Sequence, residues 1–114
     1  MHEEGRPHQG EEQIIALAKA FEAMMQAGES RFFDHDDLEL LIEHYLEKGS
    51  LRKAQQVHHH ASSLYPESLG LQLREAQILA STGKHVQAIP RLKNLLSFEP
   101  HNEEIHLTLA NIYS

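Results

Sequence analysis

Residues of the same kind recur in this chain 34 positions apart, and this period limits its fold more than any other feature. Identical residues stand at that spacing in three pairs: Gly49 and Gly83, Ala54 and Ala88, Pro66 and Pro100. Apolar residues coincide in three further sets: Ile42, Ala76 and Ala110; Tyr45, Leu79 and Tyr113; Leu64 and Phe98. A period of this length is typical of proteins in which each repeated unit buries its apolar face against its neighbour.

Each unit is predicted to contain two helices. In the first unit, residues 35–48 and 51–65 carry apolar side chains at helical spacing, and in the second unit residues 69–82 and 84–98 do the same. Glycines at positive φ and prolines are expected to end these helices. Predicted caps are Asp34, supported by a Phe33–Leu38 staple, and Ser68 and Asn102.

The period extends beyond the two units in both directions. A helix at about 11–28 has the phase of the second helix of a preceding half-unit, and residues 103–113 have the phase of a first helix. The predicted segments are a disordered start at 1–10, a capping helix at 11–34, units at 35–68 and 69–102, and a third first helix or C-terminal cap at 103–114. We expect this to be the N-terminal part of a longer array.

This combination of residues resembles the tetratricopeptide repeat (TPR), whose pattern combines large and small apolar residues, glycine, alanines and proline. The places that match are, in the first unit, Leu38, Leu41, Ile42, Tyr45, Gly49, Ala54, His58, Ala61 and Pro66, and in the second unit, Gln72, Glu75, Ala76, Leu79, Gly83, Ala88, Leu92, Leu95 and Pro100. His58, Gln72 and Glu75 depart from the pattern. Four neighbours are expected to supply the missing burial: Leu71, Leu73, Ile78 and Leu79. Pro90 predicts a bend in its helix.

The resemblance implies an all-α, right-handed solenoid of antiparallel helix pairs with about six helices. It also implies a scaffold that binds a peptide or extended segment of a protein partner in the concave groove. The groove places carry over to Asp36, Glu39, Glu43, Leu46, Glu47, Leu73, Gln77, Ala80, Leu107 and Asn111. Two alternatives stay open: a structural cap of a longer array whose binding surface lies elsewhere, and a His-dependent metal or pH sensor.

Charge indicates what kind of ligand to expect. The formal net charge is −7, and residues 1–50 alone hold twelve Asp and Glu against four Lys and Arg. An acidic surface disfavours nucleic acid and favours a basic or amphipathic ligand. Asp36, Glu39, Glu43 and Glu47 would share one helix face, where like charges repel. A plain solvated surface explains the same acidity.

The same carboxylates argue against one function within the family. Members that grip a C-terminal carboxylate do so with Lys, Asn and Arg at groove places. Those places here hold Glu39, Glu43 and Leu40 in the first unit and Leu73, Gln77 and Arg74 in the second. Carboxylates at these places would repel another carboxylate, so capture of an acidic tail is not expected.

Other functions find little support in the sequence. It has no cysteine, no GxSxG and no phosphate-binding glycine loop, so we expect neither an enzyme nor a cofactor. The run His58–His60 cannot converge on one ion from consecutive helical positions, so no metal site is predicted there, with His58 packed and the other two in solvent. No apolar run suits a membrane span or signal peptide, so the expected location is cytoplasmic.

The last helix was the ground for one prediction about assembly. Ile105, Leu109 and Ile112 form its apolar side, and a first helix normally packs against a second one that follows it. If that side lacks a packing partner, self-association through this end becomes favourable. A homodimer through the C-terminal helix is therefore left open.

Overall fold

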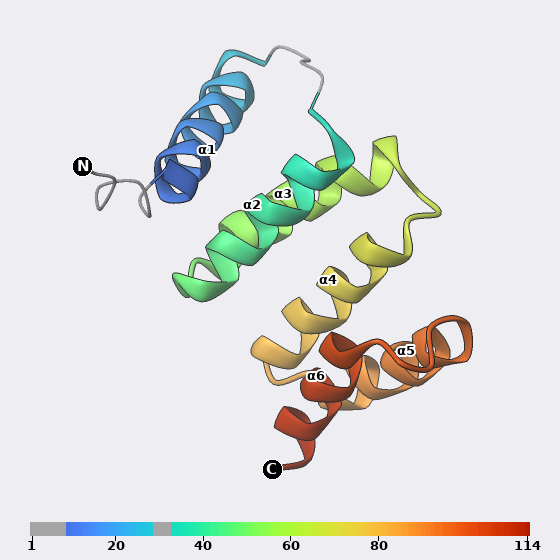
Figure 1. Ribbon diagram of the computed structural model, residues 1–114. Helices are drawn as coiled ribbons and strands as arrows, with labels where there is room; N and C mark the ends of the chain where they lie inside the picture. Colours follow the sequence, from blue (N-terminus) through green and yellow to red (C-terminus); the bar gives the residue numbers. More distant parts are fainter. Residues whose placement is uncertain (1–8, 29–32) are drawn as a thin grey trace, which may run out of the picture.

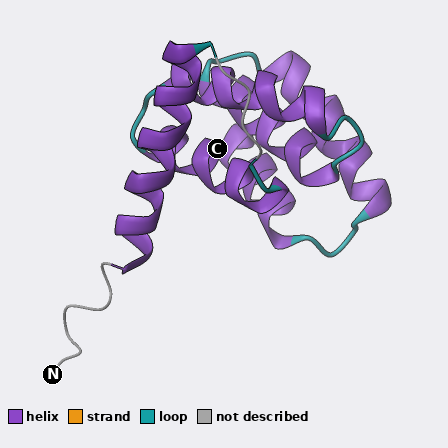
Figure 2. Cartoon of the chain, turned by 90° about the horizontal axis from the view of Figure 1, so that it is seen from above, coloured by secondary structure: helices purple, strands orange, loops and turns teal. Residues whose placement is uncertain are grey.

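The computed structural model describes residues 9–28 and 33–114, and six α-helices make up nearly all of this part of the chain (Figure 1). They are α1 (Gln9–Ala27), α2 (His35–Glu47), α3 (Leu51–Leu64), α4 (Leu69–Ser81), α5 (His85–Phe98) and α6 (Glu103–Tyr113). The described residues form no strand. Seen from above, short loops join the successive helices from α2 onward (Figure 2).

The predicted helices are confirmed, with ends that differ by at most two residues. The predicted disordered start differs more: residues 1–8 lie outside the described part, whereas residues 9 and 10 already belong to α1. None of the described helices combines the length and the apolar character that crossing a membrane requires.

The turns within the two units are built alike, as the shared glycines predict. Gly49 and Gly83 have φ of 74° and 80°. In each turn the next residue donates its amide hydrogen to a carbonyl five residues back, Ser50 to Tyr45 at 2.8 Å and Lys84 to Leu79 at 2.8 Å. This Schellman arrangement needs a residue at positive φ, which glycine adopts without strain.

Two of the three predicted caps form as expected. The side chains of Ser68 and Asn102 accept hydrogen bonds from backbone amides three residues on, each at 3.1 Å. Asp34 stands at the N-cap of α2 in an extended conformation, but its side chain caps no amide, so that part of the prediction is wrong. Phe33 and Leu38 on either side of it are both buried.

The helices pack as neighbours along the chain and as next neighbours. α2 pairs with α3 and α4 with α5, and α1 packs on α2, α3 on α4 and α6 on α5. In addition α2 contacts α4, and α4 contacts α6. Fully buried alanines, Ala54, Ala61, Ala76 and Ala88, stand where helices approach, because a small side chain permits close contact.

Buried side chains form two clusters, and α4 contributes to both. The first cluster joins α1, α2 and α3 to Leu71 and Ile78 of α4. The second joins Leu73 and Ala76 of α4 to α5 and α6. This confirms that Leu71, Leu73 and Ile78 provide burial where the repeat pattern lacks apolar residues. Leu79 packs against the second cluster in a partly buried position.

Three predicted placements in and around α3 are wrong. Val57, rather than His58, fills the core between the two alanines, and it is 1% exposed. Leu64 was expected on the buried stripe but is 45% exposed. His60 was expected in solvent, yet its ring packs edge-on against Phe21 of α1, with centroids 5.5 Å apart. The packing of α1 onto this side of α3 explains the difference.

The apolar side of α6 also differs from expectation. Ile105 and Leu109 are buried in the second cluster, and Ile112 packs against it. These three residues therefore have packing partners within the chain. The physical reason given for a homodimer through this helix is removed. Pro90 lies within α5, which continues on both sides of it.

Candidate binding groove

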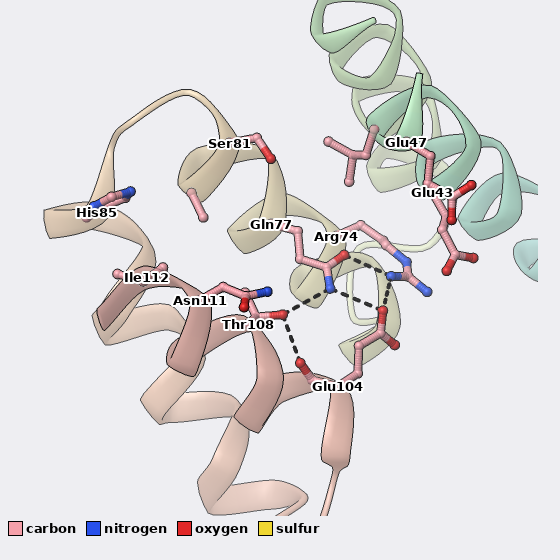
Figure 3. A pocket seen from close by; sticks show the side chains of 12 residues that line it. Glu43, Glu47, Arg74, Gln77, Ser81, His85, Glu104, Thr108, Asn111 and Ile112 are labelled. Atoms are coloured by element: carbon pink, nitrogen blue, oxygen red, sulfur yellow. Dashed lines mark hydrogen bonds and ion pairs between the residues drawn. The ribbon is translucent and has the colours of Figure 1, made fainter. Parts of the chain in front are cut away.

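A cavity of about 400 Å³ lies between α2, α4 and α6, the three helices with the phase of first helices (Figure 3). Side chains from all three helices and from the start of α5 line it: Glu43, Leu46, Glu47, Arg74, Gln77, Ala80, Ser81, His85, Glu104, Thr108, Asn111 and Ile112. Its lining is mainly polar, with three carboxylates against one guanidinium.

Arg74 of α4 is the centre of the polar network in this cavity. Its Nη1 donates to Glu104 Oε2 of α6 at 2.5 Å and to Gln77 Oε1 at 2.8 Å. Gln77 in turn donates to Glu104 at 3.1 Å and to Thr108 at 3.2 Å (Figure 3). Arg74 is only 8% exposed, so these bonds satisfy a largely buried charge and join α4 to α6.

The surroundings of Glu104 act on its pKa in opposite directions. Partial burial raises the pKa, because it removes water from the charged form. Hydrogen bonds from Gln77 and Arg74, together with the charge of Arg74, lower it and prevail, so the pKa of Glu104 lies below its ordinary value. The carboxylate is therefore ionised at neutral pH.

Glu43 and Glu47 form the α2 side of the cavity (Figure 3). They stand one helical turn apart, and neither forms an ion pair with another described residue. Their charges are not neutralised, in contrast to that of Glu104. The cavity thus presents uncompensated negative charge on one wall.

Six of the ten predicted groove residues line this cavity: Glu43, Leu46, Glu47, Gln77, Ala80 and Asn111. Leu73 does not, because it is 5% exposed and belongs to the second cluster. Leu107 does not either: it is 62% exposed and is absent from the lining, while Thr108 beside it takes part. Their predicted place in the groove is wrong.

The other two predicted residues lie at the N-terminal end of α2. The side chain of Asp36 is 93% exposed. Glu39 Oε2 lies 3.2 Å from His35 Nδ1, and its Oε1 lies 3.8 Å from Arg74 Nε. Glu39 therefore takes part in the charge network next to the cavity without lining it. A Cβ at Gly70 would overlap its carboxylate.

His35, Asp36 and Glu39 are also spaced for metal binding. One ligand atom from each lies within 4.8 Å of the others. The other ring nitrogen of His35 is hydrogen-bonded to Ser68 Oγ. Arg74 close to Glu39 opposes a further cation there, and the existing ion pairs account for the arrangement without one.

Six lining residues were not predicted: Arg74, Ser81, His85, Glu104, Thr108 and Ile112. The period held a signal for three of them. Ser81 stands 34 residues after the predicted groove residue Glu47, and Arg74 and Thr108 follow Leu40 at the same interval. Glu104 carried no such signal, because its role depends on the position of Arg74 in space.

The fold and cavity define a six-helix, all-α protein with an acidic groove over its described residues. No protein-family model matches this chain, and no solved structure matches it.

Proposed function

We propose that this chain is a TPR-type interaction scaffold that binds a basic segment of a protein partner in the cavity between α2, α4 and α6. The observation that carries the proposal is the pair Glu43 and Glu47, whose carboxylates line the cavity without an ion-pair partner among the described residues. Lysine or arginine side chains would neutralise them and remove the repulsion between them.

The TPR assignment, with a right-handed solenoid, is supported by the order of the packing contacts. Each helix in a first-helix phase packs on the preceding helix in a second-helix phase: α2 on α1, α4 on α3, α6 on α5. Helices in the first-helix phase also contact each other, and their side chains line the cavity. A cytoplasmic location and a role other than catalysis are part of the same proposal.

Charge reversal on the groove wall tests the proposal. The variant Glu43→Lys/Glu47→Lys should lose a basic partner that wild-type protein retains from lysate, and should weaken binding of a labelled lysine-rich peptide. Exposed Glu67 and Glu103 provide a matched control, because Glu67→Lys/Glu103→Lys changes the net charge equally outside the cavity lining. Circular dichroism confirms that both variants are folded. Equal binding by the two variants contradicts a groove site.

The competing proposal is a structural cap of a longer array. In that case neither variant alters binding by residues 1–114, and a longer chain retains its partner with both. The weaker competitor, a His-dependent metal or pH sensor, has one specific observation behind it, the spacing of His35, Asp36 and Glu39. Zinc or nickel should then raise the melting temperature of wild type but not of His35→Gln, and a flat response excludes it.

A further inference from the structure

A second hollow, of about 260 Å³, lies on the other side of α2, between it and α1. Its lining combines apolar and charged side chains: Gly10, Glu11, Ile14, Ile15, Leu40, Glu43, His44, Glu47 and Lys48. Ile15 is 49% exposed and Leu40 is 46% exposed, so apolar surface faces solvent within the hollow. Such surface is more favourable when covered.

The repeat explains why this hollow exists. Ile15 stands 34 residues before Gly49, where the units make their turn between first and second helix. Without a glycine there, α1 continues as a helix and starts at Gln9, two turns earlier than its phase with α3 predicts. No described residue fills the place beside α1 and α2 that a first helix would occupy in a full unit.

Glu43 and Glu47 belong to both hollows. They form the ridge of α2 that separates the cavity of the proposed groove from the hollow beside α1. A cation near this ridge is attracted from either side. The α1 hollow itself contains three carboxylates, Glu11, Glu43 and Glu47, against the single ammonium group of Lys48.

We propose that the hollow between α1 and α2 binds a basic amphipathic helix of a partner protein. Two lysine or arginine side chains one turn apart pair with Glu43 and Glu47, and a large apolar side chain of the same helix covers Ile15 and Leu40. This inference rests on the proposed function and names the partner's chemistry. It places part of the ligand beside α1, outside the cavity between α2, α4 and α6.

Geometry favours a helix over other occupants. Residues four apart on a helix have Cβ atoms about 5–6 Å apart, so basic residues spaced like Glu43 and Glu47 meet them as a pair. The hollow is smaller than the roughly 300–1,000 Å³ of small-molecule sites, but it accommodates individual side chains. Helix-in-groove binding uses this combination of apolar anchors and matched charge.

Two labelled synthetic peptides test the proposal by fluorescence anisotropy. Both are helix-forming and carry two lysines one turn apart, and they differ in having leucine or alanine at the position facing Ile15 and Leu40. Because leucine buries more apolar area than alanine, wild-type protein should bind the leucine peptide about tenfold more tightly. Leu40→Gln and Ile15→Gln should each reduce this difference to about twofold or less.

Met25→Gln is the matched control, since Met25 is 47% exposed on α1 but does not line this hollow. It should retain the tenfold preference. If wild type binds both peptides equally while Glu43→Lys/Glu47→Lys weakens both, the α1 hollow is not used and the groove proposal stands. If the charge reversal changes neither affinity, both proposals fail. Dimerisation of the chain detected by light scattering would show that a second copy covers the hollow, which overturns the inference.

Discussion

Arg74 of α4 and Glu104 of α6 are joined by an ion pair with 2.5 Å between Nη1 and Oε2, on the inner side of the groove cavity. The side chain of Arg74 is 10% exposed and that of Glu104 is 43% exposed. The arginine therefore depends on its partner more than the glutamate does. Removing either partner has different consequences, because only the buried one is left without water.

Arg74→Ala should lower the free energy of unfolding by about 1–3 kcal/mol. The change removes the bonds to Glu104 and Gln77 and leaves a void beside α4, although Glu104 can regain water. Urea unfolding followed by circular dichroism measures the effect. Arg91→Ala is the control, because its pair with Glu75 is exposed and should contribute less than about 1 kcal/mol. Equal effects would contradict the role of Arg74.

Stability should fall in acid through Glu104. A carboxyl group whose pKa is lowered on folding stabilises the protein above its ordinary value of 4.5, and this contribution is lost as the pH falls through the lowered pKa. The urea midpoint of wild type should therefore decrease below about pH 4.5. Glu104→Gln should be less stable at neutral pH and should lose less stability over that acid range. Parallel pH profiles would count against this assignment.

Tyr45 should make the protein sensitive to alkali. Burial, and then its hydrogen bond to Glu22 at 2.6 Å, raise the pKa of its phenol above the ordinary 10.0. A raised pKa stabilises the folded state below 10.0 and loses that contribution as the pH rises further. Tyr45→Phe should reduce the alkaline loss of stability and cost about 0.5–1.5 kcal/mol at neutral pH. Tyr113→Phe, at a 62% exposed position, should change neither.

His60→Leu should stabilise the protein by about 1 kcal/mol. The buried Nε2 of His60 has no hydrogen-bond partner among the described residues, whereas its ring packs against Phe21. Leucine keeps the apolar contact and removes the unsatisfied nitrogen. Thermal unfolding of His60→Leu and of the exposed control His59→Leu provides the comparison. A lower melting temperature for His60→Leu alone would show that the imidazole has a partner in solution.

The order and bounds of the helices could be predicted because their signals are local. Gly49 and Gly83 require only a turn of fixed form, and Ser68 caps an amide three residues away. Burial along a helix was harder to predict, since it depends on which neighbours pack against each face. His60 and Leu73 were misplaced for this reason.

The candidate site was predicted in part. Glu43 and Glu47 could be placed from the period alone, because they lie on a solvent-facing wall of a first helix. The role of Arg74 could not, because its partner Glu104 is 30 residues away and contacts it only when α4 and α6 pack together. A periodic pattern identifies repeated positions, and pairs that break the repeat require the folded chain.

The two clusters of buried side chains meet only in α4 among the described helices. Amide hydrogen exchange in α5 and α6 therefore reports on α1 and α2 solely through the opening of this helix. A ligand held by Glu43 and Glu47 would slow exchange in α2 directly. Slower exchange at the far end of the chain would follow only where the same ligand also restrains α4.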